Sequence, residues 1–415
     1  MIDNDRNIRQ GTAALNGRDG EETEKRMNDW EWKNGHGEAE GEERAAINEP
    51  IRVFGWNDAW QERADAVTAS AGKEWVPARV IAQYSHMYRV ITNAGERYAV
   101  VTGRYEYEAA DKGDFPAVGD WVMAELLQGD DRAVIRSLLP RRSAVSRKVA
   151  GGRMDEQIIG ANIDYLFLVS SLNQDLNIRR IERYLTAVMN SGARPVIVLT
   201  KADLCPDPEQ AAEQVRSVAP DGVPVVTVSA VTDEGRERLM PYLGTGTTVA
   251  AAGSSGAGKS TLLNWLSGTD RMRVQEIREH DARGKHTTTH RELFPVAGGA
   301  LLMDTPGMRE LQLWHADEGH EEAFGDIAAL AARCRYRDCK HDREEGCAVQ
   351  AAIRSGELAP GRYANYVKTG KELAHLARKE RHEQRDKARR SGNGSRSGGR
   401  YAREAKRVRI WDEER

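Results

Sequence analysis

The chain has 415 residues and a formal net charge of −3, and at roughly 100 to 200 residues per domain this length predicts two to four domains. Its hydrophobic content of 40% is that of a globular protein and excludes wholesale disorder. No window of the sequence approaches the roughly 18 consecutive apolar residues of a membrane span, and the first residues lack an apolar signal core. We therefore expect a cytoplasmic protein with no membrane partner.

The charge is unevenly distributed along the chain. Residues 1–49 carry 13 acidic and 7 basic side chains, with few β-branched residues and no periodicity, which predicts a disordered acidic tail. Residues 368–410 carry 15 basic and 5 acidic side chains. A solvated helix face is one interpretation of this segment, but attraction to a phosphate backbone is another, and we predict a basic flexible tail over residues 386–415.

Residues 51–140 are predicted to form a small β-barrel domain after a short helix at 56–69. Short β-branched or aromatic runs give five candidate strands, at 75–83, 87–92, 97–101, 120–125 and 133–138, and Asn93-Ala94-Gly95 is typical of a hairpin turn. Five strands in about 70 residues suit an OB-fold, whose face commonly binds oligonucleotides. An SH3-like or purely structural barrel is the alternative.

Residues 150–314, after a basic link at 141–148, show the pattern of a doubly wound α/β domain. Apolar runs predict buried parallel strands at 164–170, 196–200, 225–228, 248–252 and 300–304. Helical patterns between them predict crossover helices at 181–191, 209–218 and 260–267.

A phosphate-binding loop is predicted where one of these strands meets a helix. The motif GxxxxGK[ST] is formed by Gly253, Ser254, Ser255, Gly256, Ala257, Gly258, Lys259 and Ser260, and Thr261 continues the helix. The glycines let backbone N–H groups turn toward a β-phosphate, Lys259 supplies a charge to the β- and γ-phosphate oxygens, and Ser260 offers its hydroxyl to Mg²⁺. A glycine-rich turn with an incidental lysine is the alternative.

A base-recognition sequence follows an earlier strand. Thr200, Lys201, Ala202 and Asp203 form the tetrapeptide TKAD. The Asp203 carboxylate can accept hydrogen bonds from the guanine N1–H and N2–H₂ groups, which adenine does not offer, and Ser229-Ala230 at the next strand end fits a backbone contact to the base. Alone, the tetrapeptide is more often a capped helix start, but its position at a strand end favours base recognition.

Two further segments suit a nucleotide switch. Asp304 opens the sequence DTPG, where a carboxylate can hold Mg²⁺ and the N–H of Gly307 can meet a γ-phosphate, although the same tetrapeptide can be a plain turn. Residues 283–289 lie between the phosphate loop and DTPG and include Thr288, a candidate Mg²⁺ ligand that senses the γ-phosphate.

A Cys/His cluster follows the α/β domain. Cys334, Cys339, His341 and Cys347 supply three thiolates and one imidazole within 14 residues, the pattern of a closed structural zinc site. A disulfide within the cluster is the alternative, and Cys205 is distant and interpreted as a plain side chain. Helices predicted at 348–355 and 362–390 complete a small zinc-binding module over residues 315–385.

The order of the motifs is unusual, because TKAD and Ser229-Ala230 precede the phosphate loop, the switch threonine and DTPG. This is a circularly permuted GTPase order. With a barrel before it and a Cys/His cluster after it, residues 51–385 resemble the small ribosomal subunit biogenesis GTPases, the RsgA (YjeQ) family. The resemblance implies an OB-fold barrel, a permuted P-loop GTPase domain and a helical zinc-binding domain.

The resemblance also implies a function. The expected activity is hydrolysis of GTP to GDP and phosphate with Mg²⁺, stimulated by the 30S ribosomal subunit during its late maturation, with contacts to 16S rRNA. We expect the protein to be a monomer with one structural Zn²⁺. An RNA-binding, GTP-responsive switch with little turnover is an alternative, and a P-loop kinase is a further one against which Asp203 argues.

Two positions depart from typical GTPases. Thr200 replaces the usual asparagine and removes an amide that would brace the phosphate loop, although the resembling family tolerates threonine. Met308 stands where other GTPases place a water-orienting glutamine, and we hypothesise that His286 takes over this catalytic role. We further hypothesise that the segment after Asp304 passes a γ-phosphate-dependent shift to the zinc module.

Overall fold

The structure, a computed structural model, describes residues 50–69, 75–84, 87–109, 112–148, 156–173, 176–269, 291–304 and 317–379, with 381, 382 and 385. The predicted acidic tail at 1–49 and basic tail at 386–415 lie outside these residues. The domain boundaries drawn from the sequence stay predictions.

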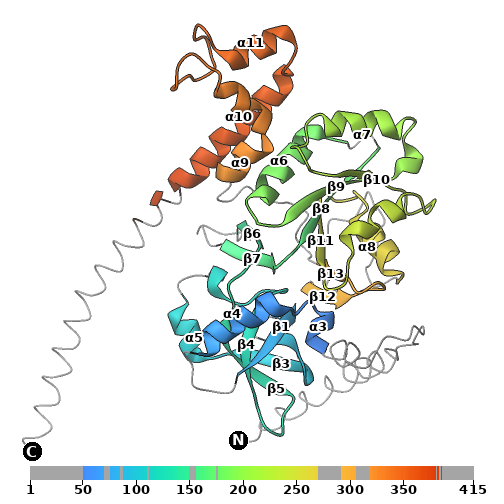
Figure 1. Cartoon of the computed structure of the whole chain (residues 1–415), viewed down its shortest axis with the longest axis vertical. Helices are drawn as coiled ribbons and strands as arrows, with labels where there is room; N and C mark the ends of the chain where they lie inside the picture. The colour runs from blue at the N-terminus through green and yellow to red at the C-terminus, as the bar shows by residue number, and fades with distance from the viewer. Residues whose placement is uncertain are drawn as a thin grey trace, which may run out of the picture. The chain divides into compact units, whose positions relative to one another are not determined.

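A closed five-stranded barrel forms the first domain (Figure 1). Its strands are β1 (Val76–Gln83), β2 (Tyr88–Thr92), β3 (Gly95–Val101), β4 (Trp121–Leu126) and β5 (Arg132–Leu138). Neighbours follow the order β1-β2-β3-β5-β4, and β4 pairs back onto β1, so the barrel closes. Only β3 and β5 are parallel among these pairs. The barrel is OB-like, which confirms the first of the two predicted architectures.

The barrel strands alternate between two apolar faces. One face fills the barrel interior with Ala78, Val80, Val90 and Ile135, as the two-residue period of a strand requires. The opposite face packs under α4 (Asp58–Thr68), where Trp56 and Trp121 meet edge to face with ring centroids 4.7 Å apart. The hairpin after β2 is tighter than predicted, because Thr92 pairs directly with Gly95 and only two residues remain in the turn.

The second domain contains a parallel sheet. Its strands are β8 (Tyr165–Ser171), β9 (Arg194–Thr200), β10 (Val225–Thr227), β11 (Thr248–Ala252) and β13 (Leu301–Asp304), in the spatial order β10-β9-β8-β11-β13. All four neighbouring pairs are parallel, as the apolar runs predicted. The carboxyl ends of these strands therefore lie along one edge, where doubly wound sheets bind ligands.

Helices cover both faces of this sheet. Buried residues of α6 (Ile178–Met189) and α7 (Pro208–Arg216) pack with Leu166, Leu168 and Ile197 on one face. Buried residues of α8 (Lys259–Ser267) pack with Phe167 and Val169 on the other. Alternate residues of β8 thus serve the two faces, which confirms the doubly wound arrangement.

The strand β12 (Arg291–Pro295) joins the two domains and was not predicted. It pairs antiparallel with β13 of the parallel sheet and with the end of β1 of the barrel. The barrel and the α/β domain consequently share one eleven-stranded sheet. The basic link predicted at 141–148 is also structured, since β6 (Ala144–Lys148) and β7 (Glu156–Ala161) form a separate two-stranded sheet.

Arg79 is buried at this junction, with an exposed fraction of 2%. Its guanidinium donates to the carbonyls of Gly119 and Phe54 and, over 2.8 Å, to the hydroxyl of Thr248 on β11. Burial lowers the pKa of Arg79 to about 10, so the group stays protonated at neutral pH. Its hydrogen bonds therefore hold the barrel and the α/β sheet together, because a buried cation is unstable unless its N–H groups are hydrogen-bonded.

A helical module completes the described chain. It comprises α9 (Asp317–Ala323), α10 (Gly325–Ala331), α11 (Ala348–Ser355) and a helix over 360–379. The first two helices were not predicted, whereas the last two were. Arg362 and Asn365 donate to the buried carboxylate of Glu182 on α6, each over 2.6 Å, and attach the module to the α/β domain.

Several short elements connect these parts. They are α3 (Pro50–Val53), α5 (Gly103–Glu108) and the 3₁₀ turns η1 (Lys112–Asp114), η2 (Ala202–Leu204), η3 (Arg236–Arg238) and η4 (Met240–Tyr242).

Candidate functional site

The predicted phosphate loop connects β11 to α8 at the carboxyl edge of the parallel sheet. Gly253, Gly256 and Gly258 have φ angles of 151°, 78° and 88°, which residues with a Cβ atom rarely adopt. A Cβ atom at Gly253 would also lie 2.1 Å from the carbonyl oxygen of Val169. The backbone geometry of the loop thus depends on these glycines.

Lys259 begins α8 and turns back over the loop. Its ammonium donates to the carbonyls of Gly253 over 2.7 Å and Ser254 over 2.6 Å. No acidic residue lies in the first turn of α8, where Ser260 and Thr261 follow. The helix N-terminus and the ammonium therefore concentrate positive charge over the loop, as anion binding requires.

The TKAD residues lie against this loop. The Thr200 hydroxyl donates to the carbonyl of Ala257 over 2.6 Å, and the Lys201 ammonium donates to the carbonyl of Gly256 over 2.8 Å. The sequence suggested that threonine at position 200 would cost the loop its brace. In the structure the hydroxyl provides one, because β9 and the loop approach closely enough for this short side chain.

Lys201 and Asp203 have distinct settings. Lys201 adopts a left-handed φ of 58°, and the chain then forms η2, with Ala202 buried. The exposed carboxylate of Asp203 accepts a 2.6 Å hydrogen bond from the hydroxyl of Ser229. The sequence predicts only a backbone contact between the Ser229 segment and the base, and it gives no signal for the side-chain bond to Asp203.

Asp304 ends β13, the neighbour of β11 in the parallel sheet. Burial, followed by the charge of Glu292 on β12, raises the pKa of its carboxyl. The carboxylate of Asp304 and the hydroxyl of Ser260 are hard oxygen donors, the type that Mg²⁺ prefers. The donor set at this edge therefore fits Mg²⁺.

The three residues predicted to act in catalysis, His286, Thr288 and Gly307, lie outside the described residues, as does Met308. Their roles stay predictions.

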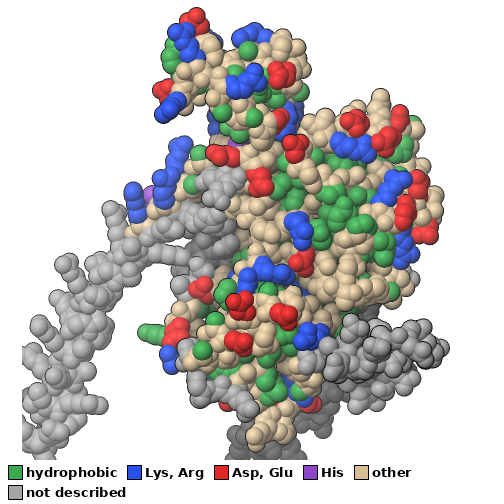
Figure 2. Space-filling view, in the orientation of Figure 1, with side chains coloured by type: hydrophobic (Ala, Val, Ile, Leu, Met, Phe, Trp, Pro, Cys, Tyr) green, Lys and Arg blue, Asp and Glu red, His purple; other side chains and the backbone are tan. Residues whose placement is uncertain are grey.

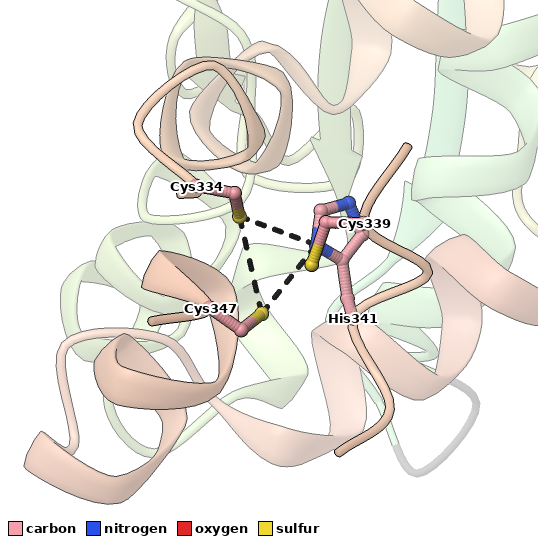
Figure 3. A group of neighbouring side chains, drawn as sticks. All are labelled: Cys334, Cys339, His341 and Cys347. Atoms are coloured by element: carbon pink, nitrogen blue, oxygen red, sulfur yellow. Dashed lines mark hydrogen bonds between the residues drawn. The ribbon is translucent and has the colours of Figure 1, made fainter. Parts of the chain in front are cut away.

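The Cys/His cluster forms a compact metal centre (Figure 3). The Sγ atoms of Cys334 and Cys347 are 3.9 Å apart, and each lies 3.5 Å from Nδ1 of His341. Zn–S bonds of about 2.3 Å and Zn–N bonds of about 2.0 Å in a tetrahedron give edges of roughly 3.8 and 3.5 Å. All four ligand atoms, including that of Cys339, lie within 4.8 Å of one another, so the cluster fits a structural Zn²⁺.

A disulfide within the cluster is excluded. All four cysteines of the chain are free thiols, and 3.9 Å between two sulfur atoms is far beyond the roughly 2.05 Å of a disulfide bond. Burial raises the pKa of the Cys334 thiol, but N–H groups of Val349 and Ala348, together with the Cys347 and Cys339 side chains, lower it overall. The pKa of the Cys339 thiol is raised to about 11, first of all by burial.

Residues around the cluster hold its loop, and none of them was predicted. The Glu344 carboxylate accepts backbone N–H bonds of 2.9 Å from both Lys340 and Asp342, and such bonds lower its pKa to about 2. The carbonyl of His341, whose φ is 58°, accepts from Gln350 over 2.6 Å and from Tyr363 over 2.9 Å. No motif in the sequence marks these partners: the Glu344 bonds span only two and four residues, and the bonds of Gln350 and Tyr363 to the His341 carbonyl span 9 and 22.

Within the described residues, no helix is both long enough and apolar enough to cross a membrane.

Comparisons with known proteins agree with this arrangement. The family model for the RsgA GTPase matches residues 138–314. The small ribosomal subunit biogenesis GTPase RsgA 2 of Lactiplantibacillus plantarum is 49% identical over 314 residues, which cover 75% of this chain and 87% of that protein. RsgA of Opitutus terrae is 45% identical over 342 residues, covering 79% of this chain and 91% of that protein.

Two solved structures share the fold. The crystal structure of YjeQ from Thermotoga maritima is 26% identical, with a TM-score of 0.55, and the match covers 72% of this chain and 99% of that one. YloQ, a circularly permuted GTPase, is 25% identical with a TM-score of 0.52, and the match covers 73% of this chain and 96% of that one. The permuted motif order, the OB-like barrel and the zinc-type cluster are thus accompanied by high identity across most of the chain, which belongs to the RsgA family of small ribosomal subunit biogenesis GTPases and is a GTP hydrolase.

Proposed function

We propose that this GTPase binds the 30S ribosomal subunit, hydrolyses GTP during its late maturation, and contacts 16S rRNA through the barrel and the zinc module. The names of its relatives give the process, small ribosomal subunit biogenesis. The observation that carries the GTP-binding part of the proposal is the bonding of the TKAD residues to the phosphate loop, through Thr200 and Lys201. A guanine contact and a phosphate contact made on these two segments would reinforce each other.

We assign the nucleotide roles as follows. The backbone N–H groups of residues 253–261 and the Lys259 ammonium bind the phosphates, and the ammonium exchanges its two carbonyl partners for phosphate oxygens. Ser260 and Asp304 hold the Mg²⁺ that accompanies GTP, and Asp203 binds the guanine. Thr288 and Gly307 sense the γ-phosphate, and His286 orients the attacking water.

The exposed side chains of the barrel and the zinc module suit RNA. Tyr98 and Tyr107 of the barrel are 41% and 91% exposed, and bases stack on such rings. Lys and Arg side chains are exposed on the module that carries α10 and α11 (Figure 2). In its metal loop, Arg335 lies over the ring of Tyr336, which is 46% exposed. Cations and aromatic rings together supply both phosphate attraction and stacking.

The decisive test is GTP turnover measured with and without purified 30S subunits. We expect slow basal turnover and a marked increase on addition of the subunits, with His286→Ala losing most of the increase. Binding to 30S without any increase in turnover would support the RNA-binding switch instead, and no binding would refute the proposal. Light scattering on the purified protein tests the proposed monomer.

Guanine recognition has a separate test. A hydrogen bond to a charged group contributes about 1.5–3 kcal/mol of binding free energy. We therefore expect Asp203→Asn to weaken GDP binding roughly 100-fold and to reduce the preference for GDP over ADP. Ser229→Ala frees the Asp203 carboxylate and also removes the acceptor of the Thr232 N–H group, and it should weaken GDP binding only a few-fold. The matched control is Asp207→Asn, since Asp207 caps α7 and asparagine caps equally well. Equal affinities for Asp203→Asn and Asp207→Asn would remove Asp203 from the site.

A further inference from the structure

One row of facing residues crosses the sheet from the barrel surface to the nucleotide site. Arg89 on β2 faces Ala82 on β1, Ala82 faces Glu292 on β12, and Glu292 faces Asp304 at the end of β13. Side chains of directly facing residues lie on the same face of a sheet. These four side chains therefore share one face, and Figure 1 shows the β12 strand that connects the two domains.

Arg89 and Glu292 form an ion pair across the intervening strand. Two strand spacings separate their backbones by roughly 9–10 Å, and the pair closes because the residue between them is Ala82, whose methyl group lies buried under it with an exposed fraction of 2%. A longer side chain at position 82 would obstruct the guanidinium. Arg89 also lies 3.4 Å from the carboxylate of Glu96 on β3.

The second carboxylate that Glu292 faces is Asp304. Facing residues of an antiparallel pair have Cβ atoms about 4.5–5.5 Å apart, so the Glu292 charge acts on Asp304 at close range. Arg89 compensates that charge from the barrel side. The side chains of Arg89 and Glu292 are 20% and 43% exposed, which leaves the pair partly shielded from water.

We propose that Arg89 is a positioning residue of the nucleotide site: acting through Glu292, its charge sets how tightly Asp304 and the bound nucleotide hold Mg²⁺. The inference rests on the proposed role of Asp304 as a Mg²⁺ ligand. It gives the barrel a charge that reaches the nucleotide site without any movement of the strands.

The sign of the effect follows from the charges. Removing the Arg89 cation leaves Glu292 uncompensated, and the added negative potential tightens divalent cation binding. Removing the Glu292 anion takes a negative charge away from the neighbourhood of Asp304 while Arg89 stays paired with Glu96, and cation binding weakens. With partial solvent screening we expect shifts of about three- to tenfold in each direction.

The test is a titration of the protein–GDP complex with Mn²⁺, a paramagnetic substitute for Mg²⁺. The concentration of free Mn²⁺ is measured from its electron paramagnetic resonance signal. We expect tighter binding for Arg89→Gln, weaker binding for Glu292→Gln and near wild-type binding for the double variant. A purely structural ion pair is broken by both single variants and shifts both in one direction. Shifts of equal sign, or none, overturn the proposal.

Two further variants complete the experiment. Arg97→Gln is the matched control, because Arg97 is a barrel arginine paired with Asp131 at 3.9 Å and distant from β12 in the strand order. Asp304→Asn distinguishes failure of the proposed Mg²⁺ ligand, Asp304, from failure of the proposed effect of Arg89. If it leaves Mn²⁺ affinity unchanged, the proposed role of Asp304 fails; if it weakens Mn²⁺ while Arg89→Gln and Glu292→Gln do not respond, only the present inference fails. If Arg89→Gln does not fold, the double variant decides: near wild-type Mn²⁺ affinity, against weaker binding by Glu292→Gln, supports the proposal, and equal affinities of these two variants overturn it.

Discussion

The hydroxyl of Thr200 holds the phosphate loop by a 2.6 Å hydrogen bond to the carbonyl of Ala257, 57 residues further along the chain. A Cβ atom at Gly258 would lie only 3.4 Å from the same hydroxyl oxygen. The TKAD segment and the phosphate loop are thus one bonded unit, although circular permutation places the first before the second in the sequence.

Thr200→Val keeps the shape of the side chain and removes the donor. A hydrogen bond of this kind contributes about 0.5–1.5 kcal/mol, so we expect GDP binding to weaken about two- to tenfold, measured by isothermal titration calorimetry. Thr200→Ser retains the hydroxyl and should bind GDP as the wild type does. Equal losses in the two variants would show that the methyl group, not the hydrogen bond, matters.

The metal centre predicts one zinc per chain. Cys347→Ser replaces a ligand at the N-terminus of α11 and should lose the metal and unfold the loop, measured by elemental analysis and by the absorption of the Co²⁺-substituted protein. Cys205→Ser is the matched control, since Cys205 is not among the four clustered ligands. Zinc retained by the first variant would contradict the four-ligand assignment.

The same centre makes a finer prediction for Glu344, whose carboxylate fixes three backbone N–H groups of the metal loop. Outer-shell partners of this kind typically change metal affinity about 10- to 100-fold. We expect Glu344→Gln to bind zinc with full stoichiometry but to release it faster to a chromogenic chelator. Glu345→Gln, an exposed neighbour, should release zinc at the wild-type rate.

The attachment of the helical module can be tested at Arg362. Its guanidinium contacts the buried Glu182 and also Asp326, over 2.7 Å, and its side chain is only 8% exposed. Removing one partner of a buried pair costs about 3–5 kcal/mol, so Arg362→Ala should sharply increase proteolytic release of the module. The double variant Glu182→Leu with Arg362→Met leaves no unpaired charge and should recover most of the resistance.

A more exposed pair provides the control for this experiment. Arg183 on α6 pairs with Glu372 over 2.5 Å, but these side chains are 37% and 35% exposed. Exposed pairs contribute about 0–1 kcal/mol, so Arg183→Ala should be cleaved almost like the wild type. Comparable sensitivity of the Arg183 and Arg362 variants would contradict the importance of burial.

Much of the fold could be predicted because periodicity and turns are local signals. Strands such as β8 and β9 differ from their predicted bounds by one or two residues. β12 was missed because its five residues, including Arg291 and Glu292, lack a strand pattern and become a strand only by pairing with β1 and β13. α9 was missed because its sequence, DEGHEEA, has hardly any apolar residues to give a helical period.

The candidate site, like the fold, has a part that the sequence predicts and a part that it does not. Motifs predicted which residues gather at the edge of the parallel sheet, since motif and strand end lie side by side in the sequence. The contacts of Thr200 with Ala257 and of Ser229 with Asp203 depend on atoms that only the fold brings together. The Glu344 contacts are local, but no motif marks them. From the sequence, the absence of an asparagine amide at position 200 therefore predicts an unbraced phosphate loop. In the structure the Thr200 hydroxyl braces it.

The shared sheet leaves few unpaired strand edges among the described residues. Unpaired strand edges can template the addition of another chain. In the described part of this protein, one end of the eleven-stranded sheet curls back on itself as β4 pairs with β1, and β12 covers the flank of β13. The remaining border is β10, only three residues long. A sheet of this size thus offers a neighbouring molecule a docking edge too short to nucleate a fibril.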